Sequence, residues 1–245
     1  MISFAVDKIL FLDIETVPQT ASLEELPENM QALWADKFTT LRIRMPEKYP
    51  ADTTAAEAFE IGAGIYAEFA KIVCISVGFI YFKGKEKIFR VKSFAGDSET
   101  DLLTAFSTLL NHFITTNQHH ICGHNIKEFD IPFICRRLLI NGLPIPETIN
   151  ITGKKPWETS FIDTLELWKF GDYKNYTSLK LLTAIFGIPT PKEDIDGAQV
   201  AAVYYKERDI NRISAYCEKD VIATARLYLR LCGLETIPEQ CIQHA

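Results

Sequence analysis

The chain has 245 residues, of which 47% are hydrophobic and 24% are charged, and its formal net charge is −6. This composition is typical of a globular protein, and we favour one domain, residues 1–245, over two small ones. The acidic balance argues against a general polyanion-binding protein, whose surface would be basic, but it does not exclude nucleic acid, because acids that hold metal ions make the total charge more negative.

The N-terminal residues lack the basic segment, apolar stretch and cleavage site of a signal peptide. No window reaches the roughly 18 apolar residues that a membrane span needs. The six cysteines are scattered without C-x-x-C pairs, which is typical of free thiols in a reducing compartment. We therefore expect a cytoplasmic protein that does not enter a membrane.

Residues 8–16 read KILFLDIET, which predicts a short buried strand followed by acids. On a strand Asp13 and Glu15 point to the same face, and Ile14 turns into the core. Two neighbouring carboxylates repel each other, and a cation relieves that repulsion. Oxygen ligands suit Mg²⁺ or Mn²⁺. Taken alone, the pair is better explained as two solvated acids at the end of a strand, and the other acidic motifs decide between the two interpretations.

Residues 17–69 carry several prolines between acidic, helical pieces, and we expect a helical insertion there rather than a separate domain. Within it, GAGIYA (62–67) matches a dinucleotide-binding fingerprint on paper. The residues before it look helical, whereas the fingerprint needs a strand.

The rest of the chain alternates between strands and helices. Strands are expected at 71–82 and 87–94, around a turn at 83–85, and a short strand is expected to end near Gly123. A strand-like start at 159–168 carries Asp163. Helices are expected at 102–113 (capped by Ser98), 130–140, 179–186 (capped by Thr177 or Ser178), from 197 or 198 (capped by Asp196) and at 210–231 (capped by Asp209). This order predicts an α/β domain with a mixed sheet.

Three acidic motifs stand in this order: D-x-E at 13–15, N-x-x-x-F-D at 125–130 and Y-x-x-x-D at 216–220. From Lys8 to Leu231 they resemble the motifs of the DEDD superfamily of 3′–5′ exonucleases, which implies a ribonuclease H-like fold. The chain looks most like the exonuclease domains of family-B DNA polymerases and the stand-alone bacterial proteins similar to them. The histidine branch has a histidine where this chain has Ala215, so Tyr216 places the chain in the tyrosine branch (DEDDy).

The resemblance implies a role for each matching residue. Asp13 would be shared by two divalent cations, Mg²⁺ or Mn²⁺, with Glu15 and Asp220 completing the first site and Asp130 serving the second. Tyr216 would orient the attacking water. The positions of Thr16, Asn125 and Phe129 match those lining the pocket of the terminal nucleotide.

The implied function is metal-dependent hydrolysis at the 3′ end of nucleic acid, with single-stranded DNA favoured over RNA. A catalytically silent nucleic-acid-binding module and an endonuclease on the same fold stay as alternatives. We expect no polymerase domain after the last helix, so any proofreading would act in trans, and the sequence identifies no polymerase or repair partner.

Other residues have both a structural and a functional interpretation. His124 and Asp163 are expected to be structural. Several cations could contact phosphates, although most surface lysines are merely solvated: Lys127, Arg136, Arg137, Lys154, Lys155, Lys174 and Lys180. The aromatic residues Trp168, Tyr173 and Tyr176 could stack on bases or pack in the core.

Overall fold

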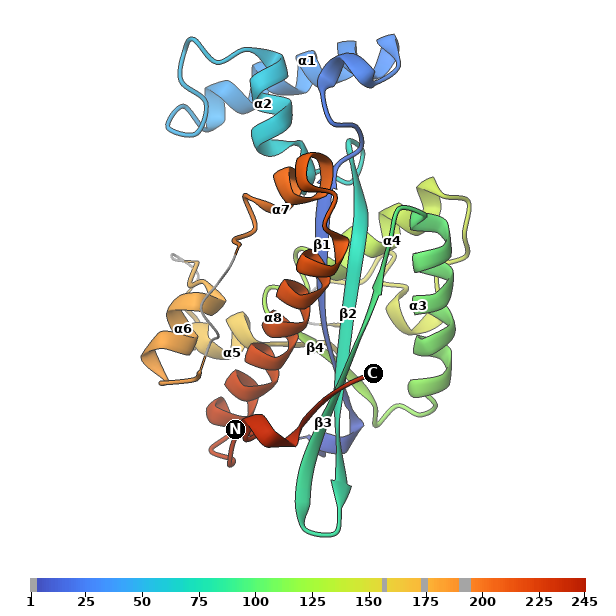
Figure 1. Ribbon diagram of the computed structural model, residues 1–245, viewed down its shortest axis with the longest axis vertical. Coiled ribbons are helices and arrows are strands. Elements are labelled where there is room, and N and C mark those ends of the chain that lie inside the picture. Colours follow the sequence, from blue (N-terminus) through green and yellow to red (C-terminus); the bar gives the residue numbers. More distant parts are fainter. Residues whose placement is uncertain (1–3, 156–157, 173–175, 190–194) are drawn as a thin grey trace.

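The computed structural model describes residues 4–155, 158–172, 176–189 and 195–245. Its centre is a six-stranded mixed sheet in the order β5-β4-β1-β2-β3-β6 (Figure 1). The strands are β1 (Ile9–Pro18), β2 (Ala70–Lys83), β3 (Glu86–Ala95), β4 (His120–Gly123), β5 (Ile162–Asp163) and β6 (Ile242–His244). β2 pairs antiparallel with both β1 and β3, whereas the β1–β4, β4–β5 and β3–β6 pairs are parallel. The predicted α/β class with a mixed sheet is confirmed.

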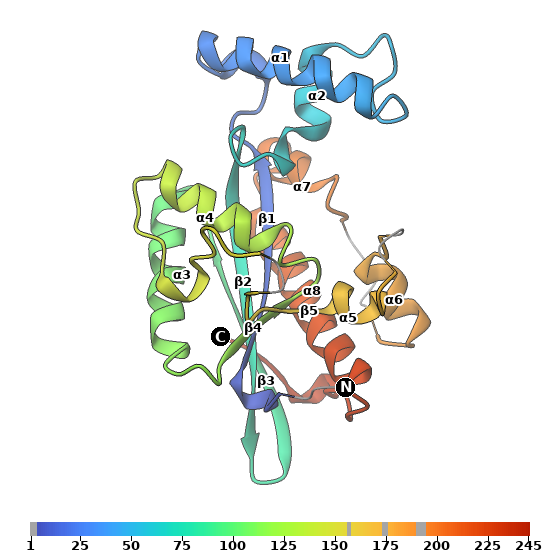
Figure 2. The same cartoon turned by 180° about the vertical axis from the view of Figure 1, so that it is seen from behind.

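The alternation of side chains along β1 assigns its residues to two faces of the sheet. Leu10, Leu12 and Ile14 belong to the core cluster on one face, together with residues of α3 (Glu99–Phe113) and α4 (Asp130–Ile140). Ile9 and Phe11 belong to the cluster on the other face, together with residues of α8 (Ile210–Leu231). The sheet is therefore covered by α3 and α4 on one side and by α8 on the other (Figures 1 and 2). By the same alternation, Asp13 and Glu15 share the face that α8 covers.

The close approach of α8 to the sheet depends on a glycine in β2. A Cβ atom at Gly78 would lie 2.3 Å from the Phe89 ring and 3.1 Å from Val221 of α8. Any larger residue at Gly78 would have to push this helix or Phe89 away.

The segment between β1 and β2 holds two helices, α1 (Glu28–Arg44) and α2 (Ala55–Gly62), flanked by 3-10 turns at Leu23–Glu25 and Ala63–Ile65. They form their own cluster around the fully buried Trp34, whose ring makes edge contacts with Phe59 and Phe69 at 5.4 and 5.1 Å between centroids. The helices lie beyond the end of β1 and do not cover either face of the sheet (Figure 1). A helix precedes the GAGIYA stretch, so the dinucleotide fingerprint lacks the strand that it needs.

The remaining elements differ from the sequence expectations in two places. The strand-like segment expected at 159–168 is a strand only at Ile162–Asp163 and continues from Thr164 as a helix. α5 (Thr164–Lys169) and α6 (Leu179–Ile185) lie beside α8, and the Ser178 hydroxyl caps α6 by accepting the Leu181 amide at 3.2 Å. The helix expected from residue 197 or 198 instead begins at Val200, as α7 (Val200–Ala202), and continues as a π-helical turn at Val203–Glu207. Asp196 accepts the Ala198 and Gln199 amides, so it closes the turn before this helix and does not cap the helix itself. None of the described helices has the length and apolarity that a membrane crossing needs.

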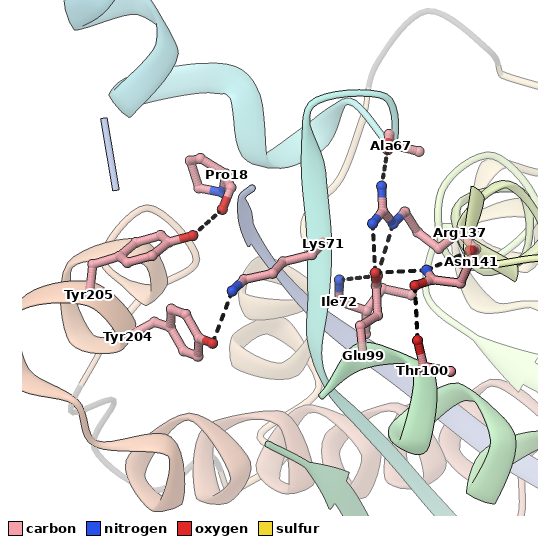
Figure 3. Close-up of polar contacts among 10 residues, drawn as sticks. All are labelled: Pro18, Ala67, Lys71, Ile72, Glu99, Thr100, Arg137, Asn141, Tyr204 and Tyr205. Carbon is pink, nitrogen blue, oxygen red and sulfur yellow. Dashed lines mark hydrogen bonds and ion pairs between the residues drawn. The ribbon is translucent and has the colours of Figure 1, made fainter. Parts of the chain in front are cut away.

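A buried ion pair joins α4 to α3 and β2. The Arg137 guanidinium donates to both carboxylate oxygens of Glu99, at 2.9 and 2.6 Å, and to the Ala67 carbonyl at 2.8 Å (Figure 3). Glu99 also accepts the Ile72 amide at 2.7 Å. Arg137 is only 3% exposed, so the prediction that it could contact a phosphate is wrong. The pair instead fixes the helix whose first residue is Asp130.

Replacing Arg137 by methionine leaves the Glu99 carboxylate buried without its cation. We expect Arg137→Met to lower the free energy of unfolding by about 3–5 kcal/mol, the usual cost of breaking a buried pair. Arg136→Met is the matched control, because Arg136 is the exposed neighbour on the same helix. Urea unfolding followed by circular dichroism measures both variants, and equal losses in the two would contradict this role of Arg137.

Candidate active site

Asp13 and Glu15 lie on β1 where its pairing with β2 continues but its pairing with β4 has ended. Asp13 stands opposite Ser76 and Glu15 opposite Cys74 of β2. Glu15 is 7% exposed, and its side chain makes no hydrogen bond within the part of the chain that the structure describes. Ile14 between them is buried in the core of the opposite face, as the alternation predicts.

The long helix α8 brings a second acid to this face. Its N-cap is Asp209, whose carboxylate accepts the Arg212 amide at 3.0 Å. Tyr216 and Asp220 lie one turn apart on the helix, and the Tyr216 hydroxyl is hydrogen-bonded to Asp220. α8 therefore delivers the tyrosine and the last carboxylate together.

Asp130 reaches the site from the other side of the sheet. β4 pairs with β1 only from Ile9 to Phe11, so the β1 edge beyond has no strand beside it. Asp130 is 3% exposed, and the Ile14 backbone lies near enough to its carboxylate to influence its pKa. Asp130 thus reaches β1 beyond the last residue that pairs with β4.

Asp13 and Glu15 lie close enough to the other acids for those charges to raise their pKa values. Burial first, and then the charges of Glu15, Asp220 and Asp130, raise the pKa of Asp13 well above its ordinary value. Burial and the charges of Asp220 and Asp130 act in the same direction on Glu15. Burial, and to a smaller extent the charge of Asp163, raise the pKa of Asp130 to about 7, although nearby backbone groups oppose the shift. Residues that are more than 200 positions apart in the chain therefore form one negatively charged cluster, which a cation would stabilise.

The loop that precedes Asp130 is held in place by Asp163. One carboxylate oxygen of Asp163 accepts the Asn125 and Leu165 amides, each at 2.9 Å, and the other accepts the Lys127 amide at 3.2 Å. Asn125 adopts a left-handed conformation with φ of 62°. Asp163 is thus the N-cap of α5 and the anchor of the Asn125 loop, which is the structural role expected for it.

His124 is also occupied in structural contacts. Its Nδ1 lies 2.9 Å from the Thr164 hydroxyl, and its Nε2 lies 2.9 Å from the Thr177 carbonyl oxygen. Burial lowers the pKa of His124, which favours the neutral ring. With both ring nitrogens in use, His124 fastens the loop to the segment before α6.

Two pockets adjoin the acids and share Ile14 and Phe129. The first, of about 360 Å³, is lined by Asp13, Asp130, Tyr216, Asp220 and Asn125, among others. The second, of about 320 Å³, is lined by Glu15, Thr16 and residues 60–65 of the segment between β1 and β2. Here the Thr16 hydroxyl donates to the Gly64 carbonyl at 2.7 Å. The Phe129 ring therefore stands between two hollows that meet at the carboxylates.

The candidate contact residues divide into several groups. Lys127 forms an ion pair with Glu166 at 2.7 Å, and Trp168 packs edge-on against Phe186, so the structure gives both a structural partner. Tyr176 and Lys180 line the first pocket. Arg136 is exposed on α4, and Lys154 and Lys155 are exposed after the loop at 151–153. Tyr173 and Lys174 lie outside the described residues.

Two contributions to the site were not predicted from the sequence. Cys217 lies beside Asp13, and the ligand atoms of Asp13, Glu15 and Cys217 all lie within 4.8 Å of one another. The sequence signal that could have identified Cys217 is its position on the same helix, three residues before Asp220. The second is the wall that residues 60–65 give to the second pocket, which is a long-range contact with no local pattern.

Comparisons with known proteins agree with the sequence motifs. A family described as predicted 3′–5′ exonucleases related to the exonuclease domain of PolB matches residues 65–239, a range that includes Asp130, Tyr216 and Asp220 but not β1. Among solved structures, the family B DNA polymerase of the hyperthermophilic archaeon Pyrobaculum calidifontis is similar, with a TM-score of 0.55 and 15% identity over 91% of this chain. The match spans 24% of that polymerase, so the chain covers about a quarter of its length. No curated protein matches the chain.

The clustered acids make a stability prediction for the metal-free protein. The folded pKa of Asp130 is raised from 3.8 to about 7, so the folded state holds a proton that the unfolded state releases between these values. Stability should therefore fall as the pH rises from about 4 to about 7. At pH 8, Asp13→Asn removes one repelling charge and should raise the free energy of unfolding by at least about 1 kcal/mol.

Asp36→Asn is the control, because Asp36 is an exposed acid on α1, and its replacement should change little. Urea unfolding in chelator from pH 4 to pH 8 provides the measurement. A loss of stability in Asp13→Asn at pH 8 would show that the carboxylates do not repel one another.

Proposed function

The chain belongs to the family of predicted 3′–5′ exonucleases related to the exonuclease domain of PolB, and on this premise we propose that it removes nucleotides from the 3′ end of single-stranded or frayed nucleic acid. The observation that carries the proposal is the convergence of Asp13, Asp130 and Asp220 at the first pocket, with Glu15 at the adjoining second pocket and close enough to Asp220 and Asp130 to feel their charges. The ribonuclease H-like fold, with its mixed sheet between helices, accords with this activity. DNA is the favoured substrate because the related domains belong to DNA polymerases, and RNA is the second candidate.

The proposed cofactors are two divalent cations, Mg²⁺ or Mn²⁺, held by the four acids. Asp13, Glu15 and Asp220 would hold one, and Asp13 and Asp130 the other. The residues fit such ions. The Glu15 carboxylate is buried and makes no hydrogen bond within the described part of the chain. A buried charge without a counter-charge is costly, and a bound cation would remove that cost. When bound, the cations would stabilise the attacking and leaving oxygens and activate water.

Tyr216 would position the water and not act as a base. Burial, and then the charges of Asp220, Glu15 and Asp13, raise the pKa of its phenol well above the ordinary value. The hydroxyl therefore stays protonated at neutral pH and can donate one hydrogen bond while it accepts another. Its bond to Asp220 fixes the direction of the phenol.

The two pockets suggest how a strand end would lie. A phosphodiester at the acids would place one nucleotide in each pocket, on either side of Phe129. The ring is partly exposed and packs on Phe133 at 5.4 Å between centroids, so it offers a supported stacking face. Thr16 would contact the nucleotide in the second pocket, and Asn125 the one in the first. A ring between two neighbouring bases unstacks them, and this costs least in a single strand or a frayed end.

Digestion of matched linear and circular single strands tests this function. Linear DNA labelled at its 5′ end should shorten stepwise with Mg²⁺ or Mn²⁺, whereas the circle should resist. Excess chelator or Asp13→Asn should remove nearly all hydrolysis, and the surface control Asp36→Asn should not. Parallel RNA strands of the same sequence decide the substrate class.

Each alternative has its own outcome in this experiment. Rapid cutting of the circle would mean internal cleavage and would support an endonuclease. If no divalent cation gave hydrolysis of any strand while the strands still bound, the chain would be a catalytically silent binding module.

A further inference from the structure

The thiol of Cys217 lies directly beside Asp13 and Glu15, and Cys217 lines neither of the two pockets that adjoin the acids. Its Sγ is 3.4 Å from the Asp13 carbonyl oxygen and 3.4 Å from Asp13 Oδ2, and the residue is fully buried in α8. With Glu15 it completes a group of three ligand atoms that all lie within 4.8 Å of one another. A magnesium site has no use for sulfur, because Mg²⁺ prefers oxygen ligands.

The distance between the sulfur and one of these oxygens suits a thiophilic ion. Tetrahedral Zn²⁺ binds sulfur at about 2.3 Å and carboxylate oxygen at about 2.0 Å, which sets the sulfur–oxygen separation at about 3.5 Å. The 3.4 Å from Cys217 Sγ to Asp13 Oδ2 is close to that value. Glu15 is 7% exposed, and its side chain makes no hydrogen bond within the described part of the chain. Its carboxylate therefore has free lone pairs beside the other two ligands.

We propose that Asp13, Glu15 and Cys217 form a mixed oxygen–sulfur site for a thiophilic divalent cation of the Zn²⁺ and Cd²⁺ class. Binding replaces the thiol proton, which leaves to solvent as the sulfur–metal bond forms, and no oxidation is involved. The site shares Asp13 and Glu15 with the acids of the proposed exonuclease. A bound Zn²⁺ or Cd²⁺ therefore competes with Mg²⁺ or Mn²⁺, and this consequence rests on the proposed function, whereas the binding itself does not.

Titration of the metal-free full-length chain with Cd²⁺ tests the site without any nucleic acid. Cadmium bound to thiolate absorbs in the ultraviolet, so the signal reports sulfur ligation directly. One Cd²⁺ per chain should bind with this absorption, and Mg²⁺ in large excess should not displace it. Cys217→Ser should abolish the band of this site and weaken Cd²⁺ binding by at least about tenfold, in line with loss of a metal ligand.

Cys135→Ser is the matched control, because Cys135 is another buried thiol that donates to a backbone carbonyl, that of Ile149 at 3.2 Å, in the core of the opposite face. It should keep both the band and the affinity. Glu15→Gln retains all six thiols and should still lower the affinity at least about tenfold, which keeps the test decisive if Cys217→Ser does not fold.

An unchanged band in Cys217→Ser, or unchanged affinity in Glu15→Gln, would overturn the proposal. Because the readout needs no substrate, a chain that binds Cd²⁺ in this way but does not hydrolyse nucleic acid would contradict only the proposed function. A chain that hydrolyses nucleic acid but lacks the band would contradict only this site.

Discussion

Mutual repulsion among four carboxylates is the constraint that the rest of the structure must meet. Asp13, Glu15, Asp130 and Asp220 come together at one edge of β1, and burial and neighbouring charge raise the pKa values of the first three. A flexible chain would separate such groups. The fold keeps them together by placing each on a regular element that is packed elsewhere.

Three separate anchors hold these elements against the repulsion. α8 packs along the sheet through Val221, Ala225 and Tyr228, which lie on one face of the part of the helix that follows Asp220. α4 is fixed in its last turn by the buried pair of Arg137 with Glu99. Asp163 and His124 fasten the loop that leads into α4. Apolar burial and hydrogen bonding thus stabilise a site that is electrostatically unfavourable without metal.

The local patterns of the sequence predict most of this arrangement, because strand and helix periods fix which residues share a face. The alternation in KILFLDIET places Asp13 and Glu15 together, and the four-residue spacing places Tyr216 with Asp220. Partners that are distant in sequence have no such signal. Three such contacts join separate elements: Arg137 with Glu99, Lys127 with Glu166, and Cys217 with Asp13. Because the sequence does not show these partners, Arg137 and Lys127 were expected as possible phosphate ligands. For the same reason, the helices expected between β1 and β2 gave no indication that their end would form a pocket wall.

The central claim is that the acids of β1, α4 and α8 hold divalent cations. Anomalous diffraction from crystals soaked in Mn²⁺ tests it most directly, because the signal locates the ion independently of any activity. We expect an anomalous peak within coordination distance of Asp13 that is shared with Glu15 and Asp220, and a second peak between Asp13 and Asp130. Strong Mn²⁺ peaks elsewhere on the molecule, with none beside Asp13, would contradict it.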